Sequence, residues 1–190
     1  MSPAKADATR RRLLDAATAD FAAHGIAGAR VDRISAAAGV NKAQLYAYFG
    51  DKLSLFDAVF GVHADAVVDA APFTADDLPG YALGLYDACV QRPELVRLVT
   101  WARLEGVSTA NRGVDTAAGA AKLRAIGEAQ RDGLVRASIA PQDVLALLMS
   151  MAMTWSSAGL SGAAAEDAPP AEHARRRQAL AEAVSRAFVP

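Results

Sequence analysis

Apolar residues recur at helical spacing along most of the chain. In the first long segment Leu13, Ala17 and Phe21 fall on one helix face, and Gly25 follows as a residue that readily ends a helix. No segment alternates apolar and polar residues for long enough to predict a β-strand. We therefore predict an all-α fold of about nine helices. Their approximate bounds are residues 7–24, 31–38, 42–49, 52–70, 81–91 (with a start near residue 75 as the alternative), 93–106, 116–138, 144–155 and 171–188.

Two of these helices are short and adjoin a tight turn, which is typical of a helix-turn-helix motif. Gly39 lies in the turn, where a positive φ ends a helix tightly, and Asn41 is a favourable N-cap for the next helix. The apolar positions predicted to face inward are Val31, Ile34, Val40, Leu45 and Phe49. Such spacing allows one helix to cross DNA while the next enters the major groove.

The outward positions of the second short helix carry residue types suited to DNA. Gln can read adenine with two hydrogen bonds, Lys can reach guanine or phosphate, and Ala can touch the methyl group of thymine. These positions are Lys42, Ala43, Gln44, Tyr46 and Ala47. The alternative for Tyr46 and Tyr48 is packing in a small core. Lys52 opens the following helix, whose N-terminus, capped by Asp51, suits a phosphate.

This stretch resembles the DNA-binding domain of TetR-family transcriptional regulators. The matching pieces are FAAHG at residues 21–25, AGVNK at 38–42, LYAYF at 45–49, and Lys52. They lie within about residues 8–60, and their order, spacing and aromatic triplet all agree with the family. The resemblance implies a homodimer in which each subunit has a three-helix DNA-binding head and a larger helical body that binds a small molecule and dimerises.

The resemblance also implies which residues contact DNA. The positions carried over are Arg30, Lys42, Ala43, Gln44, Tyr46, Ala47, Tyr48 and Lys52. Two of them depart from the family pattern. Arg30 stands where Thr or Ser often caps the helix, so we expect a different cap there and a phosphate contact through charge. Ala47 is smaller than the residue often found at its position, which leaves less side chain to reach a base.

The second half of the chain contains a long uncharged segment. Between Asp143 and Glu166 lie 22 residues without a charge. That length invites comparison with a membrane span, but the strongly apolar part ends near Trp155, and serines and glycines follow. We predict instead a short helix buried between its own core and a partner subunit. Together with the amphipathic last helix it suits a four-helix dimer interface across a two-fold axis, which the resemblance also implies.

A pocket for a small apolar effector is expected among the helices of the body, with a few polar groups in its wall. The candidate residues are Tyr81, Tyr86, Cys89, Trp101, Met149, Met153 and Trp155. Methionine side chains adapt their shape and suit a permissive pocket. Ordinary core packing is the alternative for each residue, because periodicity does not separate a pocket wall from a filled core.

Charge divides the chain into two parts. Residues 1–52 hold eight basic and five acidic residues, a net charge of +3, and the remainder carries −4. This division suits a basic DNA-binding end on a body that does not bind DNA. We place a helix-turn-helix DNA-binding domain at residues 1–52 and a ligand-binding and dimerisation domain at residues 53–190. The single Cys89 excludes an internal disulfide, and the absence of a signal peptide predicts a cytoplasmic location.

Together these features predict a transcriptional regulator, a repressor that a small molecule releases from a palindromic operator. The expected partners are duplex operator DNA and a second copy of the chain, bound through the last two helices, and no membrane. The sequence contains no phosphate-binding glycine loop and no zinc-spaced Cys/His set, so we predict no enzyme, cofactor or metal site. The alternative function is a helical small-molecule-binding protein or enzyme with a vestigial DNA-binding head.

Overall fold

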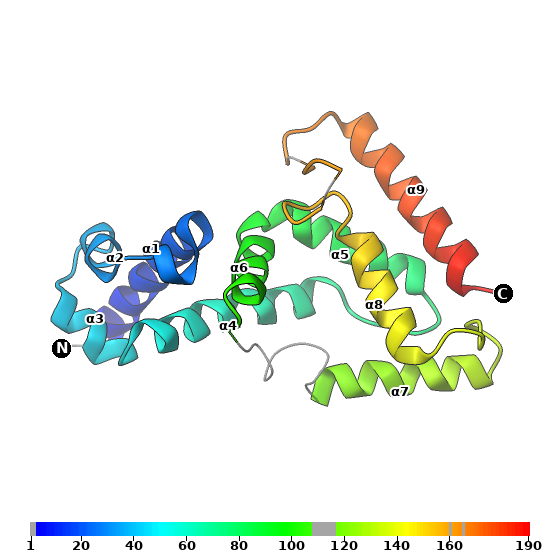
Figure 1. The fold of residues 1–190 in the computed structure, drawn as a ribbon, viewed down its shortest axis with the longest axis horizontal. Coiled ribbons are helices and arrows are strands. Elements are labelled where there is room, and N and C mark those ends of the chain that lie inside the picture. The colour runs from blue at the N-terminus through cyan, green and yellow to red at the C-terminus, as the bar shows by residue number, and fades with distance from the viewer. Residues whose placement is uncertain (1–2, 108–116, 160, 165) are drawn as a thin grey trace. The chain divides into compact units, whose positions relative to one another are not determined.

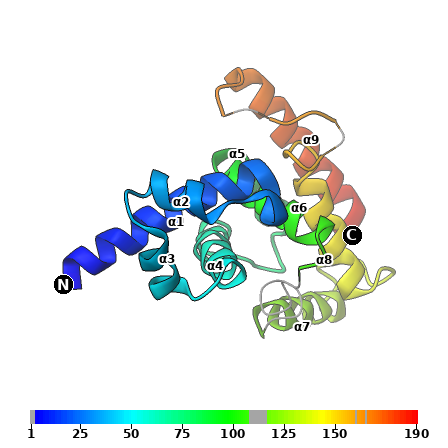
Figure 2. The same cartoon turned by 60° about the vertical axis from the view of Figure 1, so that its left-hand side comes forward.

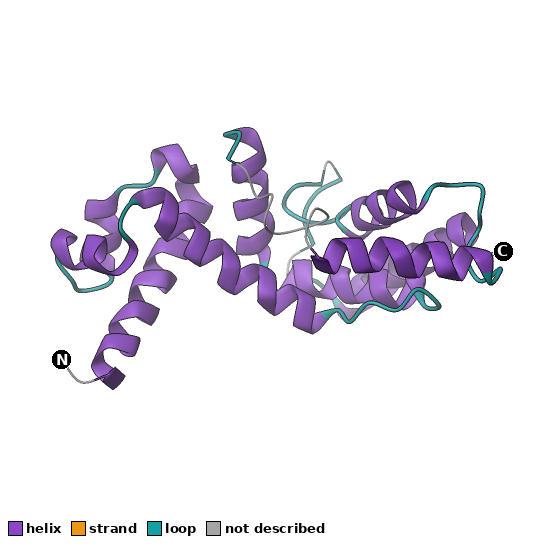
Figure 3. Ribbon diagram, turned by 90° about the horizontal axis from the view of Figure 1, so that it is seen from below, coloured by secondary structure: helices purple, strands orange, loops and turns teal. Residues whose placement is uncertain are grey.

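The structure is a computed structural model that describes residues 3–107, 117–159, 161–164 and 166–190, with all side chains in these ranges except those of residues 3 and 64–70. These ranges form nine helices and no strand (Figures 1 and 3), which confirms the predicted all-α fold. The helices are α1 (Pro3–Gly28), α2 (Val31–Ala37), α3 (Lys42–Phe49), α4 (Lys52–Ala70), α5 (Leu78–Gln91), α6 (Pro93–Leu104), α7 (Ala117–Arg131), α8 (Pro141–Ala152) and α9 (Pro170–Phe188).

The chain divides into two compact units. The head unit comprises Met1–Asp65 and Arg97–Ser108, and the body unit comprises Ala66–Val96 and Thr109–Pro190. Two helices, α4 and α6, therefore contribute residues to both units. The predicted division at residues 52 and 53 concerns where DNA binding ends and ligand binding begins along the chain, and it stays a prediction.

The core of the head unit follows the predicted periodicity. Leu13, Ala17 and Phe21 on α1 are fully buried, as are Ile34 on α2 and Leu45 on α3. From α4 the chain adds Leu55, Phe56 and Val59, which are also buried. The rings of Phe21 and Phe56 meet edge to face, with 5.3 Å between their centroids. Burial of one apolar face from each helix therefore holds α2 and α3 against α1 and α4 (Figure 2).

The first helix differs from its predicted bounds at both ends. It begins at Pro3 rather than near residue 7, because proline suits the first helical turn and the next residues are mostly good helix formers. Gly25 breaks the helix with a φ of 73°, as predicted, but one further helical turn then continues to Gly28. Gly39 lies in the turn of the helix-turn-helix and takes the expected positive φ, 65°.

In the body unit, α5 packs against α8 and α9, α8 packs against both α7 and α9, and their buried faces form one core. The largest side chains buried in it include Tyr86, Ile126, Leu145 and Phe188. The apolar stripe of α9, which ends at Phe188, therefore faces the core of its own subunit. None of the described helices is long and apolar enough to cross a membrane.

Several helices of the body differ from their predicted bounds, and α8 spans Pro141–Ala152 rather than residues 144–155. The helix predicted over residues 116–138 is α7, which ends at Arg131 because Gly133 takes a φ of 74° and turns the chain. The helix predicted over residues 81–91, for which a start near residue 75 was the alternative, is α5, which starts between the two at Leu78. There Asp77 accepts a hydrogen bond from the Gly80 N–H at 2.8 Å and caps the helix. The loop predicted over residues 107–115 lies, after its first residue, outside the described residues.

Candidate DNA-binding surface and effector residues

The N-terminus of α3 is held by a capping box. The side chain of Asn41 accepts a hydrogen bond from the Gln44 N–H at 2.8 Å, and the Asn41 N–H donates to Gln44 Oε1 at 3.4 Å. Asn41 is therefore the predicted N-cap. Gln44 is exposed, as a base-reading residue must be, but its carbonyl oxygen also stabilises the helix end.

The outward face of α3 is exposed and carries two alanines, a tyrosine and a lysine. Ala43 and Ala47 are exposed, and Tyr46 leaves 40% of its surface open. Lys42 is exposed as well, although its ammonium lies 3.1 Å from Asp32 Oδ1 on α2. An ion pair between two exposed side chains contributes little free energy, so Lys42 can exchange this partner for a phosphate.

Tyr48 and Phe49, the two aromatic residues at the end of α3, are both half-buried. The prediction placed Tyr48 outward and Phe49 in the core. The hydroxyl of Tyr48 is buried and has no hydrogen-bond partner among the described residues, which differs from the predicted outward position. Phe49, predicted to lie in the core, is only half-buried, and the guanidinium of Arg10 lies over its ring at 5.6 Å. A phosphate contact from Tyr48 requires its side chain to turn outward.

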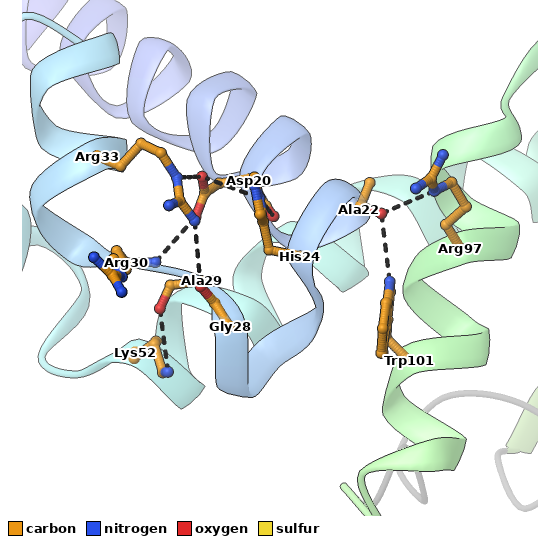
Figure 4. A network of polar contacts seen from close by, with 10 residues as sticks. All are labelled: Asp20, Ala22, His24, Gly28, Ala29, Arg30, Arg33, Lys52, Arg97 and Trp101. Carbon is orange, nitrogen blue, oxygen red and sulfur yellow. Dashed lines mark hydrogen bonds and ion pairs between the residues drawn. The ribbon is translucent and has the colours of Figure 1, made fainter.

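Lys52 bonds to backbone carbonyls of the same unit. Its ammonium donates to the carbonyl oxygen of Ala27 at 3.2 Å. It also donates to that of Ala29 at 3.4 Å (Figure 4). These carbonyls end α1 and begin the link to α2, where a cation is favoured. At the N-terminus of the same α4, Asp51 accepts a hydrogen bond from the Ser54 N–H at 2.7 Å, and hydrogen bonds from Ser54 lower the pKa of its carboxyl. Lys52 thus joins α4 to the end of α1 and to the link before α2, a role that the sequence did not reveal.

A buried carboxylate that the sequence prediction missed joins α1 to α2. Asp20 accepts the N–H of Arg30 at 3.0 Å, which caps α2 as an N-cap side chain would, and it binds Nε and Nη2 of Arg33 (Figure 4). Burial raises the pKa of Asp20. The hydrogen bonds from Arg33 and the Arg30 N–H, with the charges of Arg33 and His24, outweigh this effect and lower it below its usual value.

Arg30 shows how its departure from the family pattern is accommodated. Its own side chain makes no cap hydrogen bond at the start of α2, because Asp20 supplies the acceptor from another helix. The Arg30 residue is exposed at the N-cap position of α2. Its guanidinium is therefore available for an outside partner.

Helix α6 contacts α1 within the head unit. Nε of Arg97 and Nε1 of Trp101 both donate to the carbonyl oxygen of Ala22, at 2.8 and 3.4 Å (Figure 4). One turn later the carboxylate of Glu105 accepts the N–H groups of Ile26 at 2.8 Å and Ala27 at 2.7 Å. Trp101, predicted as an effector residue, therefore belongs to the head unit.

The other six predicted effector residues belong to the body unit. Tyr81 is buried, meets Phe73 edge to face at 4.9 Å, and accepts a hydrogen bond from Lys122 Nζ at 2.7 Å. Tyr86 is also buried, and its hydroxyl lies 2.7 Å from Nδ1 of His173. Met149, Met153 and Trp155 are half-buried.

Cys89 is half-buried on α5, between these tyrosines and the end of the helix. Burial raises the pKa of its thiol to about 11, so the thiolate is scarce at neutral pH. Among the described residues no group of three or more His, Cys, Asp or Glu side chains is placed to hold a metal ion. The Cys89 thiol is thus protonated at neutral pH and is not a reactive nucleophile.

Comparison with known proteins agrees with this arrangement. Residues 13–59 match the family model of bacterial regulatory proteins of the tetR family, and residues 77–186 match the tetracyclin repressor-like C-terminal domain. The HTH-type transcriptional repressor SCO4008 of Streptomyces coelicolor is 38% identical over 148 residues, which is 77% of either chain. The HTH-type transcriptional regulator SrpR of Pseudomonas putida is 41% identical over 56 residues, 30% of this chain and 26% of its own.

A solved structure is similar over nearly the whole chain. The transcriptional regulator SCO4942 of Streptomyces coelicolor aligns with a TM-score of 0.79 and 40% identity. The alignment covers 95% of this chain and 98% of that one. The similarity therefore includes the head, the body and their order along the chain.

Proposed function

This chain belongs to the TetR family of bacterial transcriptional regulators, and we propose that it is a dimeric repressor that leaves a palindromic operator when a small molecule binds its body. Members of this family are DNA-binding regulators rather than enzymes. The alternative of an enzyme with a vestigial head therefore finds no support. The observation that carries the proposal is the exposed face of α3, held by a capping box and bordered by exposed basic residues.

Within that surface we assign different tasks to different residues. Lys42, Gln44 and Ala43 are proposed to face base edges in the major groove, with Ala47 in a weaker apolar contact. Arg30 and Tyr46 are proposed to hold phosphates, since both are exposed. Tyr48 and Lys52 keep their proposed phosphate contacts, but each also has a structural position in the head.

The exposed surfaces of α8 and α9 support a dimer interface. Leu147 on α8 leaves 47% of its surface open, a large fraction for a leucine in the middle of a helix. Small exposed residues accompany it on both helices: Ala146, Ser150, Ala179 and Ala183. Small side chains let helices approach closely, so two copies of this pair can form a four-helix interface across a two-fold axis.

The effector is proposed to bind among α5, α8 and α9 of the body unit. Tyr81, Tyr86, Cys89, Met149, Met153 and Trp155 offer aromatic, thioether and thiol surface with few polar groups, which suits a small and largely apolar molecule. Trp101 remains an effector prediction from sequence only, since its indole contacts α1 in the head unit. A ligand with higher affinity for one state of the dimer would shift the population away from the state that fits the operator.

DNA binding is tested by fluorescence anisotropy with the duplex upstream of the protein's own gene. Arg30→Ala should weaken binding to every sequence and reduce the slope of log K against log salt by about 0.9 if Arg30 holds one phosphate. Arg124→Ala, which removes one exposed positive charge from the body unit, is the matched control and should leave the slope unchanged. Equal losses of DNA affinity and of salt slope in both variants would contradict the assignment of Arg30 to a phosphate.

Base reading requires a variant that keeps α3 capped. Gln44→Glu preserves the capping-box acceptor but removes the amide donor, so it should change sequence preference without unfolding the helix. A library of operator half-sites, selected with the wild type and with this variant, measures the change. An unchanged consensus together with unchanged affinity would remove Gln44 from the base-contacting residues.

A further inference from the structure

A buried arginine in the body unit has donors without acceptors. Arg176 on α9 is only 9% exposed, and its Nε and Nη1 atoms are buried with no hydrogen-bond partner among the described residues. Its remaining nitrogen, Nη2, lies 2.5 Å from Oε1 of Glu172. A guanidinium stays charged at any physiological pH, and buried N–H groups left without acceptors are strongly disfavoured. An acceptor is therefore required beside Arg176.

The surroundings of Arg176 are aromatic. Its guanidinium lies over the ring of Trp155 at 6.0 Å, and Trp155 in turn meets Tyr86 edge to face at 6.1 Å. The hydroxyl of Tyr86 already pairs with His173, so it does not serve the guanidinium. Two of the proposed effector residues thus form an apolar wall next to unpaired cationic donors.

The local charges favour an anion as the missing acceptor. Arg175, Arg176 and Arg177 are consecutive on α9. The acidic partners of these arginines are Glu172, paired with Arg176, and Asp87, paired with Arg177. Glu172 occupies only one nitrogen of Arg176, and a carboxylate has two oxygens that match the planar donors left on its guanidinium.

We propose that the effector is a small organic acid whose carboxylate binds the edge of the Arg176 guanidinium that Glu172 leaves open, while its apolar part lies against Trp155 and Tyr86. This inference rests on the proposed ligand-responsive function and specifies the chemical class of the ligand. Nε and Nη1 are both covered, so binding requires side chains around Arg176 to move, and the ring of Trp155 lies next to its guanidinium. Trp155 is consequently the reporter of binding.

The chain contains two tryptophans, so Trp101→Phe leaves Trp155 as the single fluorophore. In that background octanoate and benzoate are titrated, each compared with its primary amide. The acids should change Trp155 fluorescence saturably and bind at least about tenfold more tightly than the amides, because charge-assisted hydrogen bonds are lost in the amide. Equal binding of acids and amides, or no saturable change with either, would overturn the proposal and leave water as the acceptor.

Variants separate the role of Arg176 from folding. The double change Arg176→Met with Glu172→Gln removes the ion pair without leaving one charge buried, and it should abolish the preference for acids. Arg176→Lys keeps the charge but loses the two donors, and should weaken acid binding by about tenfold or more. Arg175→Met, at an exposed neighbour, is the matched control and should bind acids as the parent does. Acid preference that survives in the double variant would overturn the proposal.

Operator binding is measured on the same preparations without any acid. If the Trp101→Phe protein without further changes does not bind DNA specifically, the regulator proposal is refuted, whatever the fluorescence shows. Intact DNA binding without acid binding would refute only the chemical class of the ligand. Acid binding that also lowers operator affinity supports both.

Discussion

At the scale of single residues, Asp20 is the carboxylate on which the start of α2 depends. It replaces the missing side-chain cap at Arg30 and pairs with Arg33, whose Nη2 also reaches the carbonyl oxygen of Gly28 at 3.2 Å. The first helix of the helix-turn-helix is therefore oriented by a side chain from α1. Because the hydrogen bonds favour the ionised form, the pKa of Asp20 is lowered, and its contribution to stability depends on pH.

The sign of this dependence can be tested with Asp20→Asn. A carboxyl whose pKa is lowered by folding stabilises the fold above its ordinary pKa of about 3.9, and this contribution is lost as the pH falls through the lower folded value. The variant should lose about 1–3 kcal/mol of unfolding free energy at pH 7, and the difference from wild type should narrow toward pH 3. Urea unfolding followed by circular dichroism measures both. Asp15→Asn, at an exposed position of the same helix, is the control. If the unfolding free energies of Asp20→Asn and wild type change with pH in parallel, the stabilising role of the ionised Asp20 is refuted.

The sequence contained a signal for both buried charges. Asp20 lies three residues after Ala17 and beside Phe21, on the apolar stripe of α1. Arg176 lies four residues before Leu180, on the stripe that continues to Phe188 in α9. A charge on an apolar stripe predicts a buried ion pair, but helical spacing does not say which residue is its partner. Asp20 is paired from ten and thirteen residues away, which only the fold could show.

At the scale of the helix, the break in α1 depends on a glycine in a crowded position. A Cβ atom on Gly25 would lie 2.5 Å from Oε1 of Glu105 and 2.8 Å from Cε3 of Trp101. The positive φ of 73° excludes most side chains as well. The same carboxylate of Glu105 caps the helical turn after the break, so α6 and the end of α1 fit each other closely.

Gly25→Ala should therefore destabilise the head unit by about 2 kcal/mol or more, from the left-handed backbone and the close contact together. Gly28→Ala is the matched control. It lies on the same helix without a positive φ, and its Cβ would come no closer than 3.4 Å to His24, so little loss is expected. Thermal unfolding gives the stability of each variant, and Trp101 fluorescence reports whether the α6 contact persists. A Gly25→Ala protein as stable as Gly28→Ala would contradict the steric argument.

Helix bounds were predictable where the end is set by a local residue. Asn41, Asp51 and Gly39 are such residues, and α3 and α4 have the bounds that they predicted. The predicted end of α7 was wrong because an alanine-rich, charged sequence continues to favour a helix beyond Gly133. The burial of Val135 against the core of the body unit outweighs that preference, since it requires the chain to turn.

At the scale of the whole molecule, the proposed dimer makes a prediction about one exposed leucine. Leu147→Glu places a charge in the middle of the α8 and α9 surface and should convert the dimer to a monomer, because an unpaired charge is strongly disfavoured in a buried interface. Sedimentation velocity measures the mass, and operator affinity should fall with it. Leu134→Glu changes a leucine of similar exposure, 51% against 47%, that lies outside both helices. A dimeric Leu147→Glu protein would place the interface elsewhere.

The family and the order of head and body were predictable from the sequence because the helix-turn-helix is a local motif. The membership of α6 in the head unit was not, since its contacts with α1 join residues 75–79 positions apart. Trp101 was grouped with the effector residues for the same reason. Its aromatic character suggested a pocket wall, whereas its position is set by Gly25 and Ala22.

The capping box of α3 has a consequence for redesigning which operator the protein recognises. Gln44 both faces outward and closes the capping box, so most replacements that alter base reading also remove its hydrogen bond to the Asn41 N–H and leave only the Asn41 side chain to cap α3. Ala43 and Ala47 have no such second task, and both are exposed. Libraries intended to evolve new DNA specificity should therefore vary Ala43 and Ala47 fully and restrict position 44 to Gln and Glu.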